Sequence, residues 1–139
     1  MNLSEQIHEL NLETSIILRK IANNLGLTLS QIQLLLSVPF TSISMTDLSK
    51  ILGIDNSTLT RNLNKLEKND YIKRKKDNYD KRIYKIMLSQ KGLDFKEKIE
   101  FQLDEYSYKL LSSLNHEDRQ AVFESLEKLS WAFTKSKFN

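Results

Sequence analysis

The chain has 139 residues and a mass of 16.3 kDa, close to the commonest size of one compact domain. Forty per cent of its residues are hydrophobic and 28% are charged, the balance of an ordinary globular protein. Three glycines and one proline supply too few turn residues for a many-stranded sheet. We therefore expect a mainly α-helical fold and a single domain over residues 1–139.

The net charge of +3 is unevenly distributed along the chain. Residues 1–55 and residues 92–139 each carry a net charge of −2, whereas residues 56–91 carry eleven basic and four acidic side chains, a net charge of +7. Local basicity of this kind is typical of a surface that binds a polyanion, and nucleic acid is the leading candidate.

Several residue types and motifs that carry chemistry are missing. The chain has no cysteine, which excludes disulfides and thiol redox sensing, and with only His8 and His116 we predict no metal and no cofactor. It also lacks a Gly-rich phosphate loop, a nucleophile elbow and a His-carboxylate metal motif, so we expect no enzyme. No stretch approaches the roughly 20 apolar residues that cross a bilayer, which predicts a cytoplasmic protein with no membrane partner.

The first half of the chain is predicted to form four helices. Apolar residues recur at helical spacing over residues 3–25, which indicates a long amphipathic helix. A second helix is expected to begin after Thr28, a capping-box hydroxyl, and to end before Pro39. A short helix follows, with the hydroxyl of Ser44 and Asp47 three residues later at its start, and ends at Gly53; another begins at once with Asp55 as its N-cap. Two short helices joined by a tight glycine turn are typical of a helix-turn-helix.

Beyond Asp70 the periodicity changes. Residues 71–76 and 83–88 are rich in β-branched and aromatic side chains, and a polar loop separates them. They predict a β-hairpin, the only β element that we expect. A lone hairpin is not stable by itself, so it must pack on the helical body.

Two more helices are predicted in the last third of the chain. Ser89 can cap the first, and Asn115 can cap the second. Both carry apolar side chains on more than one face, as the first helix of the chain does. This surplus apolar surface predicts a homodimer built from residues 1–27 and 91–139. The simpler alternative is that these helices pack on one another within a monomer.

The helix after Asp55 presents a polar face opposite its apolar stripe of Leu59, Leu63 and Leu66. Arginine can contact guanine, asparagine can contact adenine, and hydroxyls, lysines and a helix N-terminus can hold phosphates. A solvated helix face is the ordinary explanation of such a pattern, but the turn before it and the basic hairpin after it favour DNA. The candidate DNA contacts are Asn56, Ser57, Thr58, Thr60, Arg61, Asn64 and Lys65.

The hairpin loop places Lys81 and Arg82 at an extended tip, where an arginine can enter an A·T-rich minor groove. Asp80 is unsuited to bind phosphate, and we expect it to orient an arginine, either Arg82 or one from the preceding helix. The four consecutive cations of residues 73–76 must face both sides of a strand, so at most half of them can point at one duplex.

Three segments together resemble the MarR (multiple antibiotic resistance regulator) family: the run from Leu48 to Arg74, the wing triplet Asp80-Lys81-Arg82, and the run from Leu88 to Gly92. The resemblance covers residues 28–95 closely. It implies a winged helix-turn-helix core over residues 28–90, flanked by N- and C-terminal dimerisation helices.

The resemblance also implies how the chain meets DNA. Each protomer of an obligate homodimer would place the helix after Asp55 in the major groove and the wing in the minor groove. The positions carried over are Ser57, Thr58, Thr60, Arg61 and Lys65 on the helix and Arg82 on the wing. Two departures are Asn56, where the family often has proline, and Asp70, where many members have glycine.

Many members of that family respond to small aromatic or anionic compounds, which makes His8, Tyr106, Tyr108 and Trp131 candidates for an effector pocket. Aromatic residues at helical spacing are more often part of a core. The leading hypothesis is a dimeric, sequence-specific transcriptional regulator, a repressor on a pseudo-palindromic operator with half-sites about 10 bp apart. The alternative is a winged-helix module for protein interaction or DNA architecture that has no specific operator.

Overall fold

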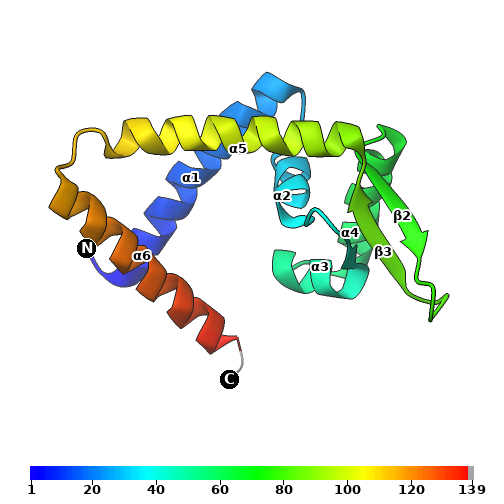
Figure 1. Cartoon of the computed structure of the whole chain (residues 1–139). Coiled ribbons are helices and arrows are strands. Elements are labelled where there is room, and N and C mark those ends of the chain that lie inside the picture. The colour runs from blue at the N-terminus through cyan, green and yellow to red at the C-terminus, as the bar shows by residue number, and fades with distance from the viewer. Residues whose placement is uncertain (138–139) are drawn as a thin grey trace. The chain divides into compact units, whose positions relative to one another are not determined.

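The structure is a computed structural model that describes residues 1–137. The predicted mainly helical fold with a small sheet is confirmed (Figure 1). The chain forms two compact units, Met1–Gln102 and the residues from Leu103 onward. Among residues 1–137, none of the helices combines the length and the apolar character needed to span a bilayer. The elements within these residues are α1 (Leu3–Leu25), α2 (Leu29–Ser37), β1 (Ile43–Ser44), α3 (Met45–Leu52), α4 (Asn56–Lys68), β2 (Ile72–Lys76), β3 (Tyr84–Leu88), α5 (Gln90–Leu111) and α6 (His116–Ser136).

Side-chain caps begin the helices at the predicted positions. In each case a side-chain oxygen accepts a hydrogen bond from the backbone N–H three residues later, at 2.7 to 3.2 Å. These bonds satisfy donors that the first helical turn leaves without an intrahelical partner. The five predicted caps confirmed in this way are Thr28, Ser44, Asp55, Ser89 and Asn115.

The predicted helix-turn-helix consists of α3 and α4. Gly53 ends α3 in the left-handed region with φ 65°, which glycine adopts without a side-chain penalty. Its N–H and that of Ile54 donate to carbonyls in the last turn of α3. Leu48 of α3 and Leu59 and Leu63 of α4 are completely buried, so both helices are anchored in the core.

The sheet has three antiparallel strands in the order β1-β3-β2. The prediction that the hairpin is the only β element is therefore wrong, because β1 adds a third strand. β1 has only two residues, with Ile43 opposite Ile86 and Ser44 opposite Lys85, too few to produce an alternating pattern in the sequence. β1 covers one edge of β3 and leaves β2 as the open edge of the wing.

The core of the first unit includes an unexpected lysine. Lys96 of α5 is only 6% exposed, and its ammonium donates a 2.6 Å hydrogen bond to the carbonyl of Val38, the C-cap of α2. Its charge also lies 5.2 Å from the centre of the Phe40 ring. A cation at the end of a helix interacts favourably with the helix dipole. Lys96 therefore links α5 to the end of α2.

The second unit contains the end of α5 and helix α6. Nε of Arg119 donates to the carbonyls of Leu111 and Leu114, both at 2.9 Å, and this guanidinium fixes the turn between the helices. No described residue of α6 is buried. Several large apolar side chains of this helix are more than 45% exposed, namely Phe123, Leu126, Trp131 and Phe133.

Candidate nucleic-acid interface

Helix α4 turns its leucine stripe into the core and its polar face into solvent. The three leucines at positions 59, 63 and 66 have no exposed surface. At its N-terminus the carboxylate of Asp55 accepts hydrogen bonds from the backbone N–H of Thr58 at 2.7 Å and from its hydroxyl at 3.1 Å. These bonds, the backbone one first, lower the pKa of Asp55, so a charged cap fixes the first turn of α4.

Most of the predicted helix contacts are accessible. Asn56, Ser57, Arg61, Asn64 and Lys65 are exposed, and the two threonines at positions 58 and 60 are half-buried. An open hollow of about 390 Å³ at the start of α4 is lined by four of these residues, Asn56, Ser57, Thr60 and Arg61. Hydroxyl, amide and guanidinium donors thus share one surface with the free N–H groups of a helix N-terminus, a combination that can hold phosphate and reach base edges.

Asn64 is held by the wing. The Arg74 guanidinium of β2 donates through Nη2 to Oδ1 of Asn64, and its Nε lies 2.8 Å from Oε2 of Glu67 as an ion pair without hydrogen-bond geometry. The Arg74 side chain is only 20% exposed. A bidentate contact to adenine would need Oδ1 of Asn64, so that residue would have to leave Arg74 to make one. In this arrangement the three residues fix the wing to α4.

At the wing tip, Asp80 contacts Arg82, one of the two partners that the sequence left open. Oδ1 of Asp80 accepts from the backbone N–H and from Nε of Arg82, at 3.0 and 3.1 Å, and Oδ2 accepts from Nη2 at 3.2 Å. The side-chain hydrogen bonds, followed by the backbone one, lower the pKa of Asp80. The Arg82 side chain remains 90% exposed, so it is oriented and still available to a ligand.

The sequence of the chain matches known regulators. The sequence profile of the MarR family matches residues 40–84, from the loop after α2 to the first residue of β3. An uncharacterized HTH-type transcriptional regulator of Bacillus subtilis, YdgJ, is 27% identical over 105 residues, 75% of this chain and 64% of that protein. The HTH-type transcriptional regulator BilQ of Clostridium symbiosum is 31% identical over 86 residues, 62% of this chain and 60% of that protein. The chain thus spans less than two thirds of either curated relative.

Solved structures extend the similarity over nearly the whole chain. A MarR protein from Peptoclostridium difficile is 26% identical with a TM-score of 0.85, and the match covers 99% of this chain and 91% of that one. Residues 40–84 match the MarR family, and nearly the whole chain has the fold of MarR structures. An Escherichia coli MarR mutant complexed with operator DNA has the same fold, with 24% identity, a TM-score of 0.76, and 91% and 92% of the two chains covered.

Two features of the wing were missed by reasoning from the sequence. The sequence groups Arg74 with the other three cations of residues 73–76, and nothing in a strand pattern shows that it reaches α4. Tyr79, between Asn78 and Asp80 at the wing tip, is 96% exposed. The signal that could have found it is a large aromatic residue in an otherwise polar loop.

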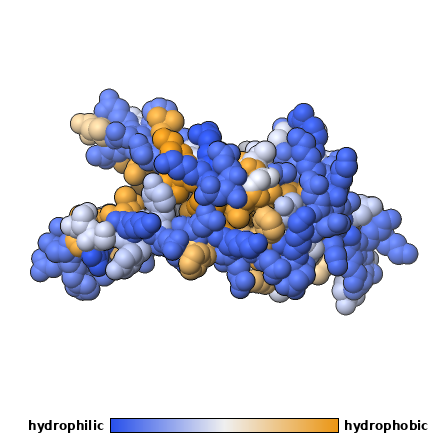
Figure 2. All heavy atoms as spheres, turned by 90° about the horizontal axis from the view of Figure 1, so that it is seen from above, coloured by the Kyte–Doolittle hydropathy of each residue, from blue (hydrophilic) through white to orange (hydrophobic). Residues whose placement is uncertain are grey.

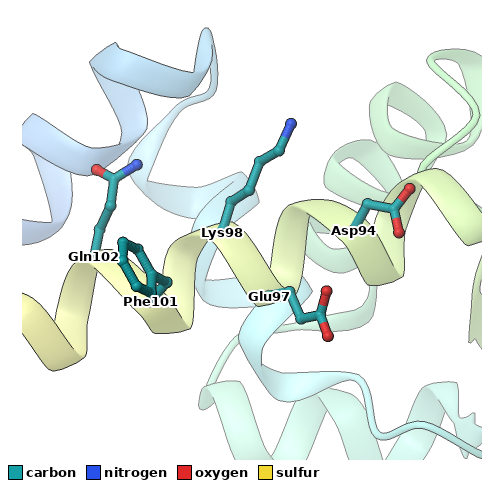
Figure 3. Close-up of a pocket in the computed structure, with 5 residues that line it drawn as sticks. All are labelled: Asp94, Glu97, Lys98, Phe101 and Gln102. Atoms are coloured by element: carbon teal, nitrogen blue, oxygen red, sulfur yellow. The ribbon is translucent and has the colours of Figure 1, made fainter.

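The predicted effector residues are all at the surface: His8 is exposed, and Tyr106, Tyr108 and Trp131 are 39%, 76% and 64% exposed. None of them lines the largest hollow described, of about 650 Å³, whose five lining side chains all belong to α5 (Figure 3). Residues 1–137 contain no cluster of three or more histidine and carboxylate side chains placed to bind a metal. The effector pocket stays a prediction.

Proposed function

We propose that this MarR-family protein is a homodimeric, sequence-specific DNA-binding regulator of transcription, a repressor that acts in the cytoplasm and has no enzymatic activity. One observation carries the proposal: α4, capped and anchored by its leucines, exposes its polar face in the same unit as a wing whose arginine is both oriented and open to solvent. The names of the similar bacterial regulators and the operator complex of the Escherichia coli protein support this function.

In this proposal residues 28–90 read the DNA and residues 1–27 and 91–139 hold two copies together. The major-groove contacts come from Asn56, Ser57, Thr58, Thr60, Arg61 and Lys65, with Asn64 as a positioning residue, and the minor-groove contacts come from Lys81 and Arg82, oriented by Asp80. The exposed apolar side chains of α1 and α6 support dimerisation, because apolar surface of this extent is stabilised by burial. They include Leu3, Leu10, Leu12 and Ile16 of α1.

DNA binding is tested by titrating the chain against its own promoter region and against random duplex of equal length. We expect a preference of at least about 10³-fold for the specific site, and a steep dependence on salt. Arg61→Ala should lower specific affinity by about 1–3 kcal/mol, and Arg82→Ala should weaken binding most at A·T-rich sites. Arg19→Ala, on the exposed side of α1, is the matched control; with its dimer mass unchanged in sedimentation equilibrium, it should change neither.

If neither arginine variant loses affinity, a module for protein interaction or DNA architecture explains the chain better. The dimer is tested separately by sedimentation equilibrium at micromolar concentration. A mass near twice 16.3 kDa is expected, and a mass near 16.3 kDa contradicts the dimer.

The same proposal includes release by a small aromatic or anionic compound, with His8, Tyr106 and Tyr108 as the candidate contacts. A library of such compounds is screened for release of the specific duplex. A compound that releases DNA from the wild type and not from Tyr106→Ala would support these contacts. Equal release from both proteins would place the compound elsewhere.

A further inference from the structure

The structure sorts the cations of the wing strands into two groups. Arg74 reaches α4, and Lys76 lies 5.9 Å from the ring centre of Tyr84, the residue opposite it on β3. Alternation along a strand then directs Lys73 and Lys75 to the opposite face of the sheet. Both are exposed.

A third lysine lies on that face. Lys85 of β3 is directly opposite Lys75 and is next to the buried Ile86, so it also points away from the core. We call the surface formed by Lys73, Lys75 and Lys85 the outer wing face. Its one anionic contact in the described wing is Asp77, 3.9 Å from Lys85 and too distant for a strong ion pair. Figure 2 shows that the wing end of the first unit is mostly hydrophilic.

The ordinary role of strand lysines explains only part of this face. Charges on an edge strand prevent sheets from pairing with each other, and β2 is such an edge, which accounts for Lys73 and Lys75. Lys85 lies on the central strand β3, where no edge needs protection. Two like charges directly opposite each other also destabilise a sheet. An anion bound between Lys75 and Lys85 would remove that repulsion.

There is room for such an anion. A hollow of about 190 Å³ is lined by Lys75, Lys85, Ser42 and Met87 and, at the base of the wing loop, by Lys76, Asp77 and Asn78, so an anion there would lie among three lysines and one carboxylate. Along β2 the two lysines are two residues apart, about 7 Å, and across the sheet the lysine pair is about 5 Å apart at Cα. A row of cations with this spacing suits successive charges of a phosphate chain better than one small anion.

We propose that the outer wing face binds the sugar–phosphate backbone of duplex DNA outside the half-site contacted by α4. This inference rests on the proposed function, because it extends the DNA surface of the same wing. It assigns Lys73, Lys75 and Lys85 to phosphate contacts that add affinity and no sequence preference.

The test compares two duplexes with the same specific site, one trimmed to that site and one extended by about ten base pairs on each side. The variant carries Lys73→Gln, Lys75→Gln and Lys85→Gln. Each lost phosphate contact lowers the slope of log affinity against log salt by about 0.9. On the extended duplex we expect the slope to fall by about 2.7 per protomer, or about 5.4 for the dimer, so an additional weakening of roughly 1,800-fold between 50 and 200 mM salt disappears.

The trimmed duplex should show little difference between the variant and the wild type. A control with Lys20→Gln, Lys98→Gln and Lys109→Gln removes the same charge from exposed positions of the helices proposed to form the dimer; with its dimer mass unchanged in sedimentation equilibrium, it should keep the wild-type slope on both duplexes. Lys75→Gln alone should not lower thermal stability, because it removes a like-charge pair, so weakened binding cannot be attributed to unfolding.

Equal slopes for the variant and the wild type on the extended duplex would overturn the inference and leave the proposed function intact. An equal loss on both duplexes would also overturn it, because the lysines would then act at the half-site itself. Saturable binding of millimolar inorganic phosphate that the triple variant loses, without any effect on extended DNA, would assign the hollow to a small anion instead. Failure of the wild type to prefer its own site, with Arg61→Ala unchanged, would refute the proposed function separately.

Discussion

Gly92 is the position where one added methyl group should do the most damage. It lies in the first turn of α5, and a Cβ built there would be 2.0 Å from the carbonyl oxygen of Tyr71, 3.1 Å from its carbonyl carbon and 3.3 Å from Cδ2 of Leu88. The nearest obstacle is backbone, which cannot rotate away as a side chain can. That same carbonyl accepts a 3.0 Å hydrogen bond from the N–H of Ser89, so moving it also weakens the start of α5.

The balance of effects on Gly92→Ala can be estimated. Overpacking costs about 1–3 kcal/mol, and loss of the bond from Ser89 adds about 1 kcal/mol. Alanine returns at most about 1 kcal/mol of helix propensity. We therefore expect a net loss of about 1–3 kcal/mol in the free energy of unfolding, a decrease in Tm of roughly 4 to 10 °C.

The assay is urea denaturation followed by circular dichroism at one fixed protein concentration, since dimerisation would make stability depend on concentration. Ser107→Ala, at an exposed position of the same helix, gains propensity without a clash and should be neutral or slightly stabilising. If Gly92→Ala behaves like Ser107→Ala, the close approach of α5 to Tyr71 is not present in the protein.

Four further substitutions test contacts at other sites. Lys96→Met leaves the Val38 carbonyl without its buried donor and should cost about 1–3 kcal/mol by urea denaturation; an unchanged midpoint would contradict the contact. Arg119→Lys keeps the charge but cannot span two carbonyls, so about 1 kcal/mol should be lost, whereas wild-type stability would show that the guanidinium is dispensable. Arg74→Met should lower specific DNA affinity several-fold and the free energy of unfolding only slightly. A large loss of stability with little loss of affinity would argue against a role of Arg74 in positioning the wing. The fold lowers the pKa of Asp55 below its usual value of 3.8. The wild type should therefore be more stable than Asp55→Asn above pH 3.8, and this difference should disappear as the pH falls through the pKa that Asp55 has in the folded state. A stability difference that does not change with pH would refute this.

The helices could be predicted because their signals are local. Thr28 and Asp55 each contact a backbone N–H three residues away, so the pattern that predicts the cap is the pattern that forms it. The signal at Gly53 is also local, because the turn between two short helices needs a residue in the left-handed conformation. The signals that start and end the helices of the helix-turn-helix are therefore contacts between residues that are close in the sequence.

The features that escaped prediction depend on residues far apart in the chain. β1 forms because Ile43 pairs with Ile86, and a strand of two residues is too short to show this pairing in its sequence pattern. Lys96 can be buried because it donates to the carbonyl of Val38. That carbonyl lies 58 positions earlier in the chain, so the sequence around Lys96 does not reveal it. Arg74 reaches Asn64 only once the hairpin has packed on α4. In each case the tertiary fold decides which partner a side chain finds.

The tertiary contacts also decide how many cations of residues 56–91 are available to bind DNA. Eleven cations between residues 56 and 91 predict a polyanion surface, but the fold withdraws three of them: Arg74 contacts α4, Lys76 lies over the ring of Tyr84, and Lys91 donates to the carbonyl of Asn69 at 2.8 Å. Arg82 and Lys85 pair with Asp80 and Asp77, but their side chains stay 90% and 47% exposed. Eight remain for phosphate or base contacts. At about 0.9 per contact, the salt slope of DNA binding should not exceed about 7 per protomer, or about 14 for a dimer. A steeper slope would mean that cations outside this segment also touch DNA, so the flanking helices would do more than hold two copies together.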